Sequence, residues 1–336
     1  MKKSFNPKTI KTIAVFVEKE LLGEGLLKLP FLQALREQFP HAHISWIVGI
    51  EKSVYTSTLK PLIKDILNNV LENIFSSKMS WKTLFLKKDL PNCSFDMIIN
   101  TENNLKKTLI LKRLPHKHFI CSLHNFLYST LKPVRPSKPV HLTEKLLKLV
   151  EVAAQKLLTE KPSHTKLPKK FLDEVTPLFK KNSTYIGLSP GAGDQRKCWP
   201  LENFIEIALQ QSKQGNIPVF ILGPQEQSLF PDLKKKLPDA LFPLQENVKL
   251  LESPLYTIAL AHCLDVAISN DSGTGHLLAA GNIPLISLFG HTRAEKVHPF
   301  SPSIHCIKSQ DLGSKNVKDI PCDLVAKKLD QILANL

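Results

Sequence analysis

The sequence contains few of the features that mark fibrous, disordered or membrane-spanning proteins. Only 13 glycines and 24 prolines occur in 336 residues, too few for a collagen-like or low-complexity chain. No apolar run approaches the roughly 18–20 residues that a membrane helix needs. The hydrophobic share of 43% is too high for a disordered chain. At about 100–200 residues per domain, this length predicts two folded domains.

An export signal and a disulfide framework are also missing. The apolar run at residues 13–17 is shorter than the roughly 7–15 residues of an export signal, and charged residues follow it directly. The six cysteines are scattered, with no CxxC pair and no metal-finger spacing. These absences predict a cytoplasmic protein with reduced thiols.

The positive charge is confined to one half of the chain. Residues 1–170 contain 29 Lys and Arg against 13 Asp and Glu, whereas residues 171–336 contain 16 against 17. Such a local excess of positive charge suits an anionic partner, either nucleic acid or an anionic lipid or saccharide. Aromatic residues are sparse in the basic stretches and no nucleic-acid module is present, so we expect no nucleic acid and favour lipid or saccharide. A general solubility charge or a lysine-rich genome would give the same count.

Short apolar runs alternate with amphipathic helical patterns, which predicts an α/β fold with parallel sheets. The expected strands are residues 12–17, 43–49, 95–100, 117–121, 184–189, 217–222, 264–269 and 284–289. A proline- and lysine-rich stretch at residues 131–140 and another at 161–170 are typical of linkers. We therefore expect two Rossmann-like domains facing across a cleft, residues 1–170 and 171–320, and a C-terminal helix at 321–336 that can pack back toward the first domain.

The segment at residues 264–280 carries the clearest chemical signal. A strand ending at Asn270 runs through a Ser-Gly-Thr-Gly turn into a helix that begins near Gly275. Free N–H groups at such a helix start suit a phosphate. A dinucleotide fingerprint fails, because Leu278 occupies a position that needs a small residue. A capped turn without a ligand is the alternative. Ser272, Thr274 and His276 offer side-chain donors to a phosphate here, and Asp271 is expected to orient the turn or His276.

A second strand leads into a glycine-containing loop at residues 190–197. Gly191 and Gly193 allow a ligand to approach the backbone closely, and Arg196 and Lys197 offer countercharges, unless they are ordinary surface cations. A third strand leads to Glu226, a carboxylate suited to ribose hydroxyls or, alternatively, to a helix start.

One carboxylate follows the first strand. Glu24 lies between Gly23 and Gly25, in a turn that we expect to open a helix. A carboxylate there ordinarily compensates the helix dipole. Facing a phosphate site across a cleft, it becomes a candidate general base.

Together these segments resemble glycosyltransferase family 9, the ADP-heptose:lipopolysaccharide heptosyltransferases. Residues 271–290, which read DSGTGHLLAAGNIPLISLFG, follow the family pattern D-[ST]-G-x-x-H-L-A-A-A-x-G-x-P-x-x-x-L-F-G except at Leu278 and Asn282. The pattern P-G-A-(x)n-K-x-W-P matches residues 190–200, and Glu24 falls on the catalytic Asp of S-L-G-D-x-L-x-T-x-P.

The resemblance implies a GT-B fold and inverting transfer of heptose from an ADP-sugar to the lipopolysaccharide inner core. It implies that Glu24 is the catalytic base and that no metal is obligatory, with Mg²⁺ at most a stimulant. The enzyme would be peripheral at the inner face of the inner membrane, with the lipopolysaccharide core or lipid A as acceptor. The donor-binding residues expected are Ala192, Gly193, Lys197, Glu226, Asp271, Ser272, Gly273, Thr274 and His276. The acceptor-binding residues expected are Lys28, Lys112 and Arg113.

Two other functions fit the same sequence. The scaffold also serves nucleotide-sugar epimerases, hydrolases and transferases of other sugars. Glu24 in place of Asp also keeps open a catalytically weak or silent relative that binds lipid or assembles with envelope enzymes.

Overall fold

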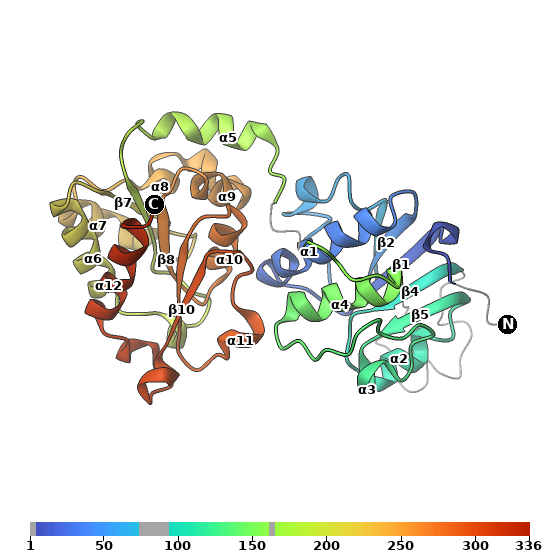
Figure 1. The fold of residues 1–336 in the computed structure, drawn as a ribbon. Coiled ribbons are helices and arrows are strands. Elements are labelled where there is room, and N and C mark those ends of the chain that lie inside the picture. Colours follow the sequence, from blue (N-terminus) through green and yellow to red (C-terminus); the bar gives the residue numbers. More distant parts are fainter. Residues whose placement is uncertain (1–4, 74–93, 161–164) are drawn as a thin grey trace. The chain divides into compact units, whose positions relative to one another are not determined.

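The computed structural model describes residues 5–73, 94–160 and 165–336 (Figure 1). The chain divides into two compact units, unit 1 (Met1–Pro162) and unit 2 (Ser163–Leu336). Each unit contains one five-stranded parallel sheet, which confirms the predicted α/β class. The boundary lies a few residues before the expected one at residue 170. Within the described ranges, no helix is both long enough and apolar enough to cross a bilayer.

The sheet of unit 1 has the strand order β3-β2-β1-β4-β5. Its strands are β1 (Thr12–Val17), β2 (His43–Val48), β3 (Asn69–Glu72), β4 (Phe95–Asn100) and β5 (His116–Cys121). The chain leaves β1 on one side toward β2 and returns on the other side as β4, so the strand order reverses between β1 and β4. Ligands of such sheets bind outside the carboxyl ends of the strands at this switch point.

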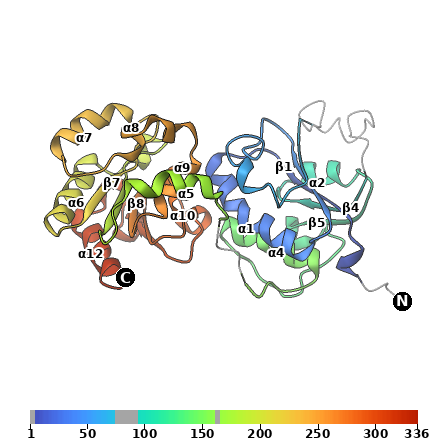
Figure 2. The same ribbon diagram turned by 90° about the horizontal axis from the view of Figure 1, so that it is seen from above.

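Helices cover the sheet of unit 1. They are α1 (Leu22–Gln38), α2 (Leu105–Leu111), α3 (Leu123–Phe126) and α4 (Leu142–Ala154), with the 3-10 turns η1 (Pro7–Thr9) and η2 (Lys60–Leu62). Both ribbon views show α1 beside α4 (Figures 1 and 2), where the Thr143 hydroxyl donates to the Leu27 carbonyl over 2.8 Å. α1 begins at Leu22, so the expected turn around Glu24 is already the first turn of this helix.

The sheet of unit 2 has the strand order β10-β9-β8-β6-β7. Its strands are β6 (Tyr185–Ser189), β7 (Ile217–Phe220), β8 (Val266–Asn270), β9 (Leu285–Phe289) and β10 (Ile304–Lys308). Here the order reverses between β6 and β8. The second switch point therefore lies where the loops after Ser189 and Asn270 begin.

Unit 2 also contains several helices. They are α5 (Lys169–Val175), α6 (Leu201–Lys213), α7 (Phe230–Lys236), α8 (Pro243–Glu246), α9 (Leu255–Ala261), α10 (Gly273–Ala280), α11 (Ala294–Val297) and α12 (Cys322–Leu333). The 3-10 turns are η5 (Thr176–Leu178), η6 (Gln195–Lys197), η7 (Gln227–Leu229), η8 (Val248–Glu252), η9 (Ser309–Leu312) and η10 (Val317–Asp319).

The C-terminal helix α12 is an amphipathic helix of unit 2. Its apolar side chains Val325, Leu329 and Ile332 are buried in the core of that unit, together with residues of β6, β8 and α6. The sequence predicts a helix that can pack back toward the first domain. The helix is present and its apolar face packs within unit 2, whereas its packing toward the first domain stays a prediction.

Candidate functional site

In unit 2, two loops meet at the switch point between β6 and β8, and one side chain holds them together. Asn270, the last residue of β8, is fully buried; its amide donates to the Pro190 carbonyl over 2.7 Å, and its oxygen accepts from the Trp199 N–H over 3.0 Å. The Trp199 ring is buried as well and donates to the Ile320 carbonyl. The loop after β6 is thereby fixed against the end of β8. Asn270 was not among the residues predicted for the site, although it ends the predicted strand.

Lys197 and Asp271 form an ion pair at this junction. Lys197 Nζ lies 2.7 Å from Asp271 Oδ2, and the Lys197 side chain is 28% exposed whereas that of Asp271 is 7% exposed. Arg196, in contrast, is 78% exposed and makes hydrogen bonds through its guanidinium to both carboxylate oxygens of Asp194. These bonds lower the pKa of Asp194 to about 2. The neighbouring cations thus differ, because only Lys197 is directed to the start of α10.

Helix α10 begins at Gly273, two residues earlier than the sequence predicts, with Ser272 as its N-cap. The Ser272 hydroxyl accepts from the Gly275 N–H over 3.2 Å. A Cβ atom at Gly273 would meet nothing within 4 Å, so the backbone is open at the helix start. Thr274 and His276 lie in the same first turn and are half-buried. An open helix N-terminus next to an ammonium is suited to a phosphate.

Glu226 lies against the glycine-containing loop. A Cβ atom at Gly191 would lie 2.4 Å from Cδ of Glu226, and one at Gly223 would lie 2.8 Å from Glu226 Oε2. The carboxylate is therefore accommodated because both positions lack side chains. Ala192 is half-buried in this loop, and Gly193 is exposed with open space around it. Unit 2 thus gathers all the expected donor-binding residues along the carboxyl edge of its sheet.

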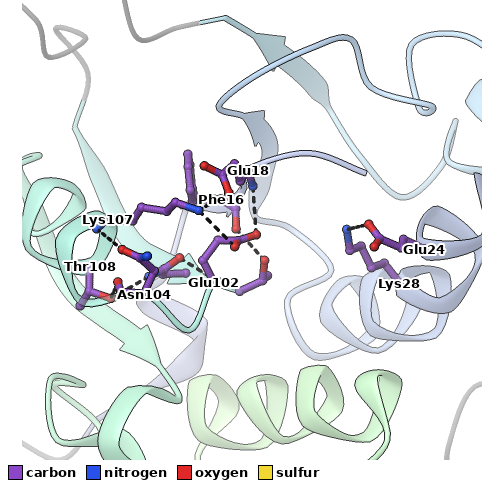
Figure 3. A network of polar contacts seen from close by, with 10 residues as sticks. Phe16, Glu18, Glu24, Lys28, Glu102, Asn104, Lys107 and Thr108 are labelled. Atoms are coloured by element: carbon purple, nitrogen blue, oxygen red, sulfur yellow. Dashed lines mark hydrogen bonds and ion pairs between the residues drawn. The ribbon is translucent and has the colours of Figure 1, made fainter. Parts of the chain in front are cut away.

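In unit 1, Glu24 and Lys28 lie one turn apart on α1 (Figure 3). Lys28 Nζ is 3.8 Å from Glu24 Oε2 and 3.8 Å from Glu20 Oε2. The Glu24 side chain is 48% exposed, whereas those of Lys28 and Glu20 are 6% and 0% exposed. Lys28, expected to bind the acceptor, is thus a buried cation between two carboxylates.

Sequence reasoning missed the groups that hold Glu20. Its Oε1 accepts from the Trp46 indole N–H over 3.3 Å and from the Ser53 hydroxyl. Burial raises the pKa of Glu20, an effect that the bond from Ser53 and the Lys28 charge oppose. Trp46 lies on β2 and Ser53 in the loop after it, far from Glu20 in sequence and without a recognisable motif.

A second ionic network lies at the β1/β4 switch point itself (Figure 3). The Lys107 ammonium contacts Glu18 and lies 3.5 Å from Glu102 Oε2, while Glu102 Oε1 accepts from the Glu18 N–H over 3.1 Å. Asn104 caps α2 by accepting from the Lys107 N–H. This network ties the ends of β1 and β4 together, and sequence analysis did not identify it.

Lys112 and Arg113 do not join the group around Glu24. They follow α2 and precede β5, close to Pro115, whose carbonyl accepts from the N–H of Phe95 at the start of β4. They therefore lie toward the amino edge of the sheet, whereas Glu24 follows β1 at the carboxyl edge. Lys112 Nζ lies 5.9 Å from the centroid of the Phe119 ring.

The described part of the chain contains no group of three or more His, Cys, Asp or Glu side chains that could hold a metal ion. Its described cysteines, Cys121, Cys198, Cys263, Cys306 and Cys322, carry free thiols. Cys93 lies outside the described residues.

A comparison with family models identifies the family of this chain. The model of glycosyltransferase family 9 (heptosyltransferase) matches residues 83–326. Lipopolysaccharide heptosyltransferase 3 of Escherichia coli (strain K12) is 24% identical over 298 residues, which cover 84% of this chain and 83% of that protein.

Solved structures share the fold. A glycosyl transferase of family 9 from Veillonella parvula superimposes with a TM-score of 0.71 at 17% identity, covering 97% of this chain and 98% of that one. The Escherichia coli heptosyltransferase WaaC with ADP gives a TM-score of 0.63 at 16% identity, covering 96% and 99%.

Proposed function

The chain belongs to glycosyltransferase family 9 (heptosyltransferase) and is a transferase, and on that premise we propose that it moves a heptose from ADP-heptose, or a similar ADP-sugar, to the lipopolysaccharide inner core. The names of its relatives support ADP-heptose as the donor and lipopolysaccharide as the acceptor. The observation that carries the proposal is the ion pair of Lys197 with Asp271 at the open start of α10. There an ammonium and backbone N–H groups are available together to one diphosphate.

The donor half of the reaction follows from this arrangement. As the bond between the anomeric carbon and the diphosphate oxygen breaks, negative charge grows on the leaving ADP. Lys197 and the N–H groups at Ser272 and Gly273 stabilise that charge. Glu226 binds ribose hydroxyls, and Thr274 and His276 support the phosphate end. The site therefore supplies its own positive charge and needs no obligatory metal.

The acceptor half of the reaction needs a base. Inversion requires an acceptor hydroxyl oxygen to attack the anomeric carbon from the face opposite the leaving group, and its proton passes to the Glu24 carboxylate. The products are the glycosylated acceptor and ADP, with the proton on Glu24. The exposure of the Glu24 side chain supports this role.

The charge of the first half of the chain supports an anionic acceptor. Lipid phosphates and acidic core sugars would be attracted to a surface rich in Lys and Arg. The same attraction would place the enzyme at the cytoplasmic face of the inner membrane.

A transfer assay tests the proposal. The full chain is incubated with a set of ADP-sugars and truncated lipopolysaccharide acceptors, and products are identified by mass spectrometry. We expect ADP-heptose to give an acceptor heavier by one heptose. Donor turnover without an acceptor would instead indicate an epimerase or hydrolase. ADP binding without any turnover would indicate a silent relative.

A further inference from the structure

The buried ammonium of Lys28 joins a hidden carboxylate to an exposed one. Its Nζ lies 3.8 Å from both Glu20 Oε2 and Glu24 Oε2, yet the Lys28 side chain is only 6% exposed. An ammonium removed from water needs charged partners nearby. Glu20, with no exposed side-chain surface, supplies one of them from inside the unit. Glu24 is the partner that meets solvent.

The Glu20 carboxylate, the most deeply buried of the three charged groups, is held in place by hydrogen bonds. Glu20 Oε1 is bound by Trp46 and Ser53, while Glu20 Oε2 accepts no hydrogen bond from the described residues and lies 3.8 Å from Lys28 Nζ. Lys28 therefore cannot turn outward without leaving a buried carboxylate oxygen uncompensated, which would cost free energy.

The backbone beneath Glu24 is fixed as well. The Tyr55 hydroxyl donates to the Gly25 carbonyl over 2.7 Å, and a Cβ atom at Gly25 would lie 2.6 Å from Cγ2 of Val54. The first turn of α1 is thus held against the segment after β2. With the backbone held, the remaining freedom of Glu24 is rotation of its long side chain, and the Lys28 charge restrains that rotation.

We propose that Lys28, held by Glu20, is a positioning residue that directs the Glu24 carboxylate for proton abstraction, and that it does not bind the acceptor. This inference rests on the proposed role of Glu24 as the base. Its consequence is energetic coupling between positions 24 and 28, because Lys28 acts only through the carboxylate that it orients.

A double-mutant cycle in the transfer assay tests this coupling. Lys28→Met should lower kcat roughly 10- to 100-fold, the scale of a misplacement on the order of 1 Å. The KM for ADP-heptose should change by less than about threefold, because donor binding does not involve the base. In the Glu24→Gln background, Lys28→Met should lower kcat almost no further. If Lys28→Met instead caused a structural defect, its effect on kcat would multiply that of Glu24→Gln. The double variant Glu20→Gln/Lys28→Met removes both buried charges, should fold without an uncompensated ion, and should keep the loss in kcat.

Lys148 provides the matched control. It is also a lysine with a 6% exposed side chain in unit 1, paired over 2.9 Å with Glu151. Lys148→Met should lower the melting temperature but leave kcat unchanged.

The outcomes separate the two proposals. If the wild type transfers heptose but Lys28→Met keeps its kcat, or lowers it equally with and without Glu24, the positioning role is wrong and the proposed function stands. If the wild type transfers no sugar at all, the proposed function fails and the positioning role fails with it.

Discussion

The two units each place an ion pair at the carboxyl edge of a sheet, but with opposite polarity. In unit 2 the anion, Asp271, is buried and the cation, Lys197, is partly exposed. In unit 1 the cation, Lys28, is buried and the anion, Glu24, is exposed. In each pair, therefore, only one charged side chain is exposed to solvent, and its buried partner of opposite charge restrains its position.

This difference indicates which chemical group the exposed charge of each unit is suited to contact. A partly exposed ammonium at a helix start is complementary to a phosphate, whereas an exposed carboxylate is complementary to a hydroxyl that gives up its proton. Buried partners limit the rotation of the presented group, which matters because catalysis depends strongly on orientation. Four predictions test the comparison.

The largest expected effect on the transfer rate comes from removing the exposed carboxylate of Glu24. Glu24→Gln should lower kcat about 100- to 10,000-fold, because the amide cannot accept the proton. The affinity for ADP, measured by isothermal titration calorimetry, should stay the same, since the change lies in the other unit. Undiminished turnover would show that another group acts as base.

Removing the presented cation should have the next largest effect. Lys197→Met should weaken ADP binding and lower the transfer rate by roughly 100-fold, because the leaving diphosphate loses a positive charge. Arg196→Met is the matched control. Its guanidinium is exposed and already paired with Asp194, so transfer should stay within about threefold of wild type. A reversed order of the two effects would assign the phosphate to Arg196.

A smaller effect is expected from displacing Glu226 without removing it. Gly191→Ala adds a Cβ atom where the Glu226 carboxylate lies, and the flexible side chain should swing away. We expect ADP affinity to fall about tenfold, near the worth of one hydrogen bond to a charged group. Calorimetry on Glu226→Gln and on the double variant should show that the two losses do not add. Additive losses would place Glu226 outside the nucleoside site.

The smallest effect concerns the buried end of the unit 1 pair. Burial raises the pKa of Glu20 above its ordinary value of 4.5. A carboxyl whose pKa is raised by folding contributes stability below pH 4.5, and this contribution is lost as pH rises through the folded-state pKa. From pH 4 to 7, wild type should therefore lose unfolding free energy relative to Glu20→Gln. Urea titrations across this range would reveal it, and parallel curves for the two proteins would contradict it.

The two units also differ in how many of their candidate site residues can be predicted from the sequence. The eight expected strands are present, and the edge strands β3 and β10 were missed because their half-buried residues lack a strong apolar run. In unit 2 the side chains expected to bind the donor follow strand ends within short segments, so the local pattern predicts their position. Lys197 and Asp271 were both expected around the donor, but their direct ion pair was not predicted, because the two residues are 74 positions apart and follow different strands.

In unit 1 the support of the candidate base is spread over distant positions. Trp46 and Ser53 bind Glu20, just before α1, and Tyr55 binds the Gly25 carbonyl within it. All three come from β2 and the segment after it, and none belongs to a recognisable motif. The burial of Lys28 is equally hidden, because a lysine on a helix normally predicts a solvated charge. Such long-range contacts become visible only when the chain is folded.

The buried amide of Asn270 has a consequence for how a nucleotide enters unit 2. One side chain fastens the loop at Pro190 and the backbone at Trp199 to the residue that precedes Asp271. Moving the loop away from β8 would break both of these buried hydrogen bonds, so we expect the proposed diphosphate site to be largely preformed. Little ordering entropy is then left to be lost on binding, and affinity depends on complementarity.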